Sequence, residues 1–277
     1  MLAANTFTLR NGLNIAPIGL GTYSIHDPGL FIEAINAGYQ LFDTAAKYGN
    51  EKELGLALKS ANQRGSIIIS KVHDILYLGR KRYFHIDKRS IRKCFKISTQ
   101  NLGGLKPNIY LLHSMFSGYS EAYKELISLY EANEVQAIGV CNCLDIGKLK
   151  NIRQECGQYP MINQIEVHPF FFPKNVIDFC QDNDIQVIAR SPLAHGDILY
   201  EMNTCLSHLS KLYSREPVQI TLRWLIQKHI VPIPRTNNPK HLKQNIAITD
   251  FTISHSDMQY IDNLNRNISF GFFTAKV

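Results

Sequence analysis

Four side chains that can hold or transfer protons stand at or shortly after the ends of short apolar runs: Asp43, Tyr48, Lys71 and His113. A phenol with an ordinary pKa of about 10 is a weak acid at neutral pH unless a nearby cation stabilises the phenolate. Lys71 can supply that cation, Asp43 can hold the Lys71 side chain, and His113 can orient a carbonyl or relay a proton. This set suits reduction of a carbonyl by hydride, because the nascent alkoxide needs a proton.

Each of the four residues also has a purely structural interpretation. An Asp before a helix is often a cap, a Tyr often packs in a half-buried position, and a Lys at a strand end often only reaches solvent. A His after an apolar strand is usually a hydrogen-bonded structural residue. Because all four residues lie at or just after strand ends, a common site is favoured over four unrelated structural roles.

The elements that must position these residues are eight short apolar runs that alternate with segments of helical periodicity. The runs are 18–20, 39–42, 67–70, 109–112, 137–140, 162–165, 186–189 and 230–233. Strands buried on both faces and separated by amphipathic helices predict an α/β protein, a closed parallel (β/α)₈ TIM barrel. An open doubly wound sheet is the alternative, but Gly19 and Gly21 do not form a G-x-G-x-x-G fingerprint.

Two local sequence patterns predict further elements beside the eight strands. Residues 7–15 alternate around Asn11-Gly12 and predict an N-terminal β-hairpin. Residues 38–51 lead a strand into a loop and then a helix, for which Asn50 and Glu53 predict a capping box. No linker interrupts the sequence, so a single domain over 1–277 is expected.

Bulk properties narrow the class of protein. With 277 residues, 45% of them hydrophobic and 19% charged, the chain can bury a large core. The absence of a signal-peptide pattern and of a long uncharged apolar run predicts a cytoplasmic protein that does not contact a membrane. The net charge of +7 comes from basic residues that are mostly spread out, so nucleic acid is not the expected partner.

Other site chemistries lack their signatures. The six cysteines have no paired spacing, so disulfides are not expected. There is no H-x-x-x-H and no C-x-x-C, which argues against a metal site, and no G-x-S-x-G, which argues against a serine nucleophile.

Polar residues follow every predicted strand. In a (β/α)₈ barrel the carboxyl ends of the strands share one face, so these residues should meet around one cavity. They are Gly21, Thr22, Tyr23, Asp43, Lys71, His113, Asn142, Gln164, Arg190, Ser191, Arg235 and Thr236.

Ordered motifs over nearly the whole chain resemble those of the aldo-keto reductases. The matching segments are 38–45 continuing to Glu51 and Leu54-Gly55, then 70–72, 110–114, 138–142, 163–169, and 233–236 continuing to Gln244-Asn245. Four residues depart from the usual pattern: Gln40 and His241 replace arginines, Cys141 replaces a serine, and Arg190 replaces an aromatic residue.

The resemblance implies a barrel that binds NADPH or NADP⁺ without a Rossmann domain, with NADH as an alternative. Asp43, Tyr48, Lys71 and His113 match the catalytic tetrad. Asn142 and Gln164 match residues that hold the nicotinamide carboxamide, and Arg235 and Thr236 match the site of the adenosine 2′-phosphate. The full set of expected cofactor-binding residues is Gly21, Thr22, Asn142, Gln164, Arg190, Ser191, Leu193, Arg235, Thr236, His241, Gln244 and Asn245.

These inferences together predict an oxidoreductase that reduces a small aldehyde or ketone to an alcohol, with Tyr48 as the general acid. The alternative is a nucleotide-binding regulatory barrel with little turnover. Arg190 is expected either to stack on the nicotinamide or to pair with a carboxylate such as Asp197 or Glu166. The substrate and the oligomeric state remain open at this stage.

Overall fold

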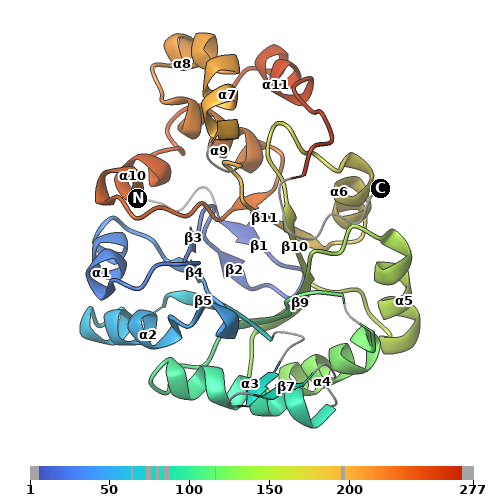
Figure 1. Cartoon of the computed structure of the whole chain (residues 1–277). Coiled ribbons are helices and arrows are strands. Elements are labelled where there is room, and N and C mark those ends of the chain that lie inside the picture. The colour runs from blue at the N-terminus through green and yellow to red at the C-terminus, as the bar shows by residue number, and fades with distance from the viewer. Residues whose placement is uncertain are drawn as a thin grey trace.

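Eight parallel strands form one continuous sheet in the computed structural model, which describes residues 6–63, 65–72, 76–78, 81–83, 88–115, 117–194 and 197–269 (Figure 1). Each predicted apolar run overlaps one of them, so the prediction of eight strands is confirmed. The strands are β3 (Leu20–Gly21), β4 (Leu41–Asp43), β5 (Ile67–Val72), β8 (Ile109–Leu112), β9 (Ala137–Cys141), β10 (Ile162–Glu166), β11 (Gln186–Arg190) and β12 (Val231–Pro232).

Backbone hydrogen bonds join the first and last strand segments and close the sheet. Gly19 N donates to Pro232 O and Gly21 N donates to Pro234 O, each at 3.0 Å. A Cβ atom on Gly21 would lie 2.8 Å from the Ile233 carbonyl oxygen, so the close approach requires glycine. The two glycines therefore serve the closure of the (β/α)₈ barrel.

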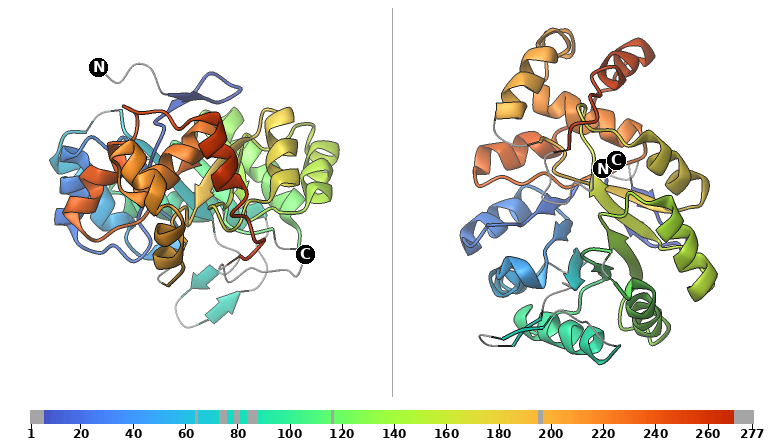
Figure 2. Two further views of the ribbon diagram at one scale, coloured as in Figure 1. Left: turned by 90° about the horizontal axis from the view of Figure 1, so that it is seen from above. Right: turned by 45° about the vertical axis from the view of Figure 1, so that its right-hand side comes forward.

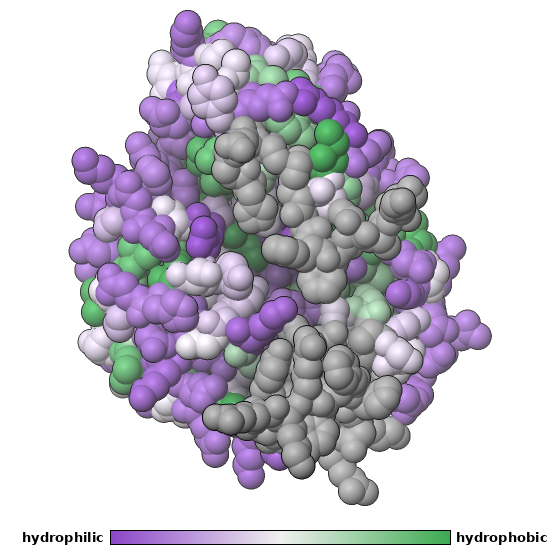
Figure 3. Space-filling model, in the orientation of Figure 1, coloured by the Kyte–Doolittle hydropathy of each residue, from purple (hydrophilic) through white to green (hydrophobic). Residues whose placement is uncertain are grey.

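Helices surround the sheet (Figures 1 and 2), and each α-helix contributes buried apolar residues to the hydrophobic clusters that it shares with the strands. Among the residues coloured by hydropathy on the face seen in Figure 3, hydrophilic ones predominate and apolar ones are scattered. The helices are α1 (Pro28–Asn36), α2 (Glu51–Ser60), α3 (Lys88–Asn101), α4 (Tyr119–Glu131), α5 (Ile146–Cys156), α6 (Lys174–Asp182), α7 (Asp197–Cys205), α8 (Ser207–Tyr213), α9 (Pro217–Gln227), α10 (Pro239–Ile246) and α11 (His255–Asp262), with a 3₁₀ turn η1 (Ala46–Tyr48).

The capping box predicted at the start of α2 is wrong. Asn50 occupies the N-cap position, but its side chain makes no capping hydrogen bond. Instead its buried amide donates to Thr22 O at 2.6 Å and Ile25 O at 2.8 Å, and it accepts from Thr44 Oγ1 at 3.0 Å. Tertiary contacts thus use the side chain that the local pattern assigned to the helix.

The predicted N-terminal hairpin is confirmed and covers one end of the barrel. Strands β1 (Phe7–Thr8) and β2 (Asn14–Ile15) pair antiparallel around a turn in which Gly12 has a φ of 85°. Leu9 and Ile15 are buried against side chains of the barrel interior. Figure 2 shows the hairpin at the opposite end of the barrel from a second antiparallel hairpin, formed by β6 (Leu76–Leu78) and β7 (Lys81–Tyr83).

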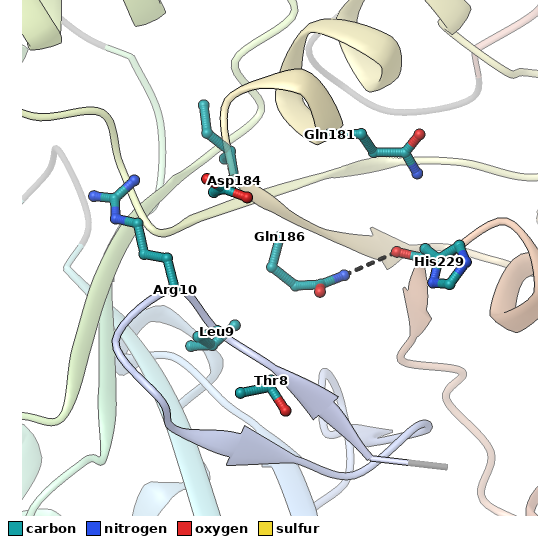
Figure 4. A pocket seen from close by; sticks show the side chains of 8 residues that line it. Thr8, Leu9, Arg10, Gln181, Asp184, Gln186 and His229 are labelled. Carbon is teal, nitrogen blue, oxygen red and sulfur yellow. Dashed lines mark hydrogen bonds between the residues drawn. The ribbon is translucent and has the colours of Figure 1, made fainter.

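A hollow of about 370 Å³ lies between the N-terminal hairpin and the amino end of β11 (Figure 4). Several of its polar groups bind backbone oxygens: Gln186 Nε2 donates to His229 O at 3.0 Å, and Arg10 Nη1 donates to Pro160 O at 3.1 Å. The Arg10 bond thus holds the hairpin against the barrel, whereas the Gln186 bond joins β11 to the residues before β12.

All six cysteines are free thiols, as predicted. Within the described ranges, no helix combines the length and apolar character that crossing a bilayer requires.

The protein should lose stability as the pH rises above about 10, because burial raises the pKa of Tyr39, Tyr110 and Tyr123. Each folded pKa lies above the unfolded value, so the stabilisation is complete below that value and is lost as the pH rises towards the folded pKa. Each phenol then removes up to about 1.4 kcal/mol of unfolding free energy per pH unit. Urea midpoints at pH about 8 and about 11 measure the loss, and Tyr123→Phe should show a smaller fall than the parent protein. An equal fall of the urea midpoint in both proteins would contradict the contribution of the Tyr123 phenol to this loss of stability.

Candidate active site

Lys71 lies at the centre of the candidate site, and its ammonium group has three acceptors. The side chain is 0% exposed, and Nζ donates to Asp43 Oδ2 at 2.7 Å, to Thr44 O at 2.8 Å and to Tyr48 Oη at 3.3 Å. Three acceptors match the three N–H donors of a lysine ammonium. Because the Tyr48 oxygen accepts from Lys71, its own proton is available to a different acceptor.

The local backbone brings Tyr48 to this position. After β4 the chain is extended at Ala45, turns through η1 and leaves it at Gly49, which has a φ of 68°. This left-handed conformation suits glycine and reverses the chain towards α2. The tyrosine thereby returns to the carboxyl end of β5, where Lys71 lies.

Gln164, one of the two residues predicted to hold the nicotinamide carboxamide, hydrogen-bonds directly to the proton-transferring group. Its Nε2 donates to Asp43 Oδ1 at 2.7 Å, so both carboxylate oxygens of Asp43 have partners. On the other side, the Cys141 thiol lies 3.9 Å from Gln164 Oε1. Burial raises the pKa of Cys141 to about 12, so it remains a thiol and a weak donor at neutral pH.

Burial is the largest influence on the acidity of Tyr48. It raises the pKa of the phenol, Lys71 lowers it and Asp43 raises it, and the net direction is upward. The pKa of Lys71 also lies above its usual value, since the attraction of Asp43 and Tyr48 outweighs the effect of burial. Tyr48 is therefore a protonated phenol beside a charged ammonium at neutral pH, and the cation only partly offsets the effect of burial.

Two aromatic rings flank Tyr48. The His113 ring centroid lies 5.7 Å from that of Tyr48, and the exposed Tyr23 ring lies 5.2 Å from it, both in edge-to-face geometry. The structure thus brings together all four residues of the predicted proton-transferring set. Gly21 pairs with Asp43 across the β3–β4 register, which places Gly21 and Thr22 beside the same group.

Arg190 takes the second of its two predicted alternatives, an ion pair with Glu166. Its Nη2 lies 3.2 Å from Glu166 Oε2, and its Nε donates to Asn142 Oδ1 at 2.6 Å. The side chain of Asp197 lies outside the described residues. Beyond β11, Ser191 is half-buried with a φ of 49°, and Leu193 packs on the helix layer.

The residues predicted to hold the 2′-phosphate surround the start of α10. Arg235 is exposed and its Nη1 donates to Tyr23 O at 3.4 Å, which links this region to the ring beside Tyr48. Thr236 Oγ1 lies 3.4 Å from His241 Nδ1. Gln244 is exposed and Asn245 is buried on α10, and within the described part of the chain neither side chain hydrogen-bonds to another predicted site residue.

Sequence reasoning missed two participants. Thr44 contributes only a backbone oxygen, which residue type does not reveal. Ser269 Oγ donates to Glu166 Oε2 at 2.9 Å across 103 residues of sequence, and no local pattern indicates that contact. No group of three His, Cys, Asp or Glu residues in the described segments could hold a metal ion.

Comparisons with known proteins identify the family. The profile described as "Aldo/keto reductase family" matches residues 30–266. The uncharacterized oxidoreductase YtbE of Bacillus subtilis (strain 168) is 32% identical in an alignment of 269 residues that covers 95% of this chain and 94% of that protein.

Solved structures agree with this match. MGS-M4, an aldo-keto reductase from a Medee basin deep-sea metagenome library, superimposes with a TM-score of 0.88 at 28% identity, covering 98% of this chain and 99% of that one. A Gox0644 mutant solved in complex with NADPH has a TM-score of 0.85 at 26% identity, covering 95% of this chain and 94% of that one. Since both the sequence profile and the fold match over most of its length, the chain belongs to the aldo/keto reductase family.

Proposed function

We propose that this protein reduces an aldehyde or ketone to an alcohol with NADPH, and that Tyr48 donates the proton. The observation that carries the proposal is the contact of 3.3 Å between Tyr48 Oη and the Lys71 ammonium, which is itself paired with Asp43. Because Tyr48 Oη accepts this hydrogen bond from Lys71, the phenolic hydrogen is available for a substrate oxygen.

Several described residues fit a nicotinamide dinucleotide. Thr22 Oγ1 is buried and has no hydrogen-bond partner among the described residues, and Thr22 N donates to Asp43 O at 3.0 Å. Asn142 and Gln164 offer amide groups that can hold a carboxamide, and Arg235 can bind a phosphate with its guanidinium. The NADPH complex of the Gox0644 mutant supports the same choice of cofactor.

In the proposed reaction the bound reduced nicotinamide supplies the hydride. Tyr48 holds its proton at neutral pH because burial raises its pKa, and it releases that proton to the strongly basic oxygen that forms on the substrate. Lys71 stabilises the phenolate that remains, and Asp43 keeps Lys71 in place. His113 lies beside the phenol, where it can orient the carbonyl.

Loss of the NADPH absorbance during incubation with aldehydes, ketones and sugars tests the proposal. Turnover with at least one carbonyl class is expected. Tight nucleotide binding without turnover on any of them would instead favour the regulatory barrel.

Arg235→Gln should weaken NADPH binding about 10- to 100-fold and leave NADH binding unchanged. Hydrogen bonds to charged groups contribute about 1.5–3 kcal/mol, and about 1.4 kcal/mol corresponds to a tenfold change in Kd. Titration of nucleotide fluorescence measures both constants. Lys150→Gln, which removes an exposed cation on α5, is the matched control. An equal loss for NADH and NADPH would remove Arg235 from the phosphate site.

A further inference from the structure

A continuous chain of hydrogen bonds runs from the segment after α11 to the loop after β8. Ser269 Oγ donates to Glu166 Oε2 at 2.9 Å, and Arg190 Nη2 binds the same oxygen at 3.2 Å. Arg190 Nε donates to Asn142 Oδ1 at 2.6 Å, and Asn142 Nδ2 donates to His113 O at 2.9 Å. The chain thus joins five separate segments of the barrel rim.

Glu166 fixes one end of Arg190. Its side chain is 1% exposed, and Oε1 lies 3.1 Å from Nε2 of the fully buried His168. A carboxylate removed from water is stable only with charged or hydrogen-bonding partners, so Arg190 is held at Oε2. The Arg190 side chain is 23% exposed, and its planar fork presents Nε and Nη2 in fixed directions.

Asn142 is fixed by the other end of Arg190. Its backbone has a φ of 59°, its Oδ1 accepts from Arg190 and its Nδ2 donates to His113 O. With both amide atoms bonded, the side chain has one orientation about its last torsion. One hydrogen on Nδ2 and one lone pair on Oδ1 remain for a ligand amide.

The charge of Arg190 is largely compensated by Glu166. A lone guanidinium beside the nicotinamide would repel the cationic oxidised ring. The Arg190–Glu166 ion pair has little net charge, so this repulsion is weak. The consequence of Arg190 is therefore geometric: it sets the direction of the Asn142 amide.

We propose that Arg190 and Glu166, supported by Ser269, form a brace that fixes the Asn142 carboxamide and thereby selects a single orientation of the nicotinamide ring. The inference rests on the proposed function. Arg190, Glu166 and Ser269 are positioning residues, since they act through Asn142. Without the brace, the amide rotates and the ring binds in two orientations.

Arg190→Lys tests the brace, because lysine keeps the charge but cannot reach Glu166 and Asn142 with one rigid fork. Transferred Overhauser effects between the nicotinamide and ribose protons of bound NADP⁺ should show one ring orientation in the parent protein and a mixture in the variant. With NADPH deuterated on either face of the nicotinamide, the hydride should come from one face in the parent protein and from both in the variant. Turnover should fall about 10-fold, since misplacement of reacting groups is costly, while KM for the carbonyl changes little.

Two further variants and one control complete the test. Glu166→Gln should mix the orientations as Arg190→Lys does, and Ser269→Ala should do so to a smaller degree. Arg10→Lys is the matched control, because Arg10, like Arg190, donates to two oxygens, but these are the backbone oxygens of Tyr159 and Pro160 at the far end of the barrel.

A single ring orientation in Arg190→Lys and Glu166→Gln would overturn the brace, even if both variants had a lower Tm. Absence of turnover in the parent protein would instead refute the proposed function. The two failures are distinct, because the Overhauser measurement needs only bound nucleotide.

Discussion

Tyr48→Phe is expected to reduce carbonyl turnover about 10²- to 10⁴-fold, the usual contribution of a positioned general acid. The substitution removes only the hydroxyl oxygen, and the ring can keep its edge-to-face contacts with Tyr23 and His113. The NADPH dissociation constant should therefore change little. Lys71 loses one of its three acceptors but keeps Asp43 and Thr44, so the protein should remain folded.

Single-turnover kinetics and nucleotide titration separate the two expectations for Tyr48→Phe. Tyr23→Phe is the matched control, since it removes a hydroxyl from the neighbouring exposed ring and should leave the rate nearly unchanged. A Tyr48→Phe protein that retained more than about a tenth of the parent rate would be incompatible with general acid catalysis by this phenol.

Lys71→Met should lose both turnover and stability. The pKa of Tyr48 should rise further without the cation that lowers it, and the phenol loses the donor that directs its proton, so turnover should fall about 10²-fold or more. Asp43 would keep Gln164 Nε2 but lose its buried cation, and breaking a buried ion pair typically costs about 3–5 kcal/mol. Urea unfolding and turnover measure the two losses.

The double variant Asp43→Asn with Lys71→Met distinguishes the two effects. It removes the unpaired buried carboxylate, so part of the stability should return, whereas turnover should stay low because the cation beside Tyr48 is still missing. Recovery of turnover together with stability would show that Lys71 acts only on folding.

The sequence alone determined the architecture. Short apolar runs bounded by turns and alternating with helical periodicity are local signals, and all eight runs became strands of one parallel sheet. The same rule placed Asp43, Lys71, Asn142 and Gln164 near one barrel end, because the carboxyl ends of parallel strands share an edge. The N-terminal hairpin followed likewise from Asn11-Gly12 between alternating residues.

Only the tertiary structure decided how the polar side chains pair. Asn50 matched a local capping pattern, yet it binds Thr22 and Ile25 from a loop more than twenty residues away. Arg190 had two candidate partners in the sequence, and the parallel pairing of β10 with β11 placed Glu166 opposite Arg190 in the register, so Glu166 became its partner. The pairing of buried charges depends on which distant groups share a dry environment, and that information exists only after the chain has folded.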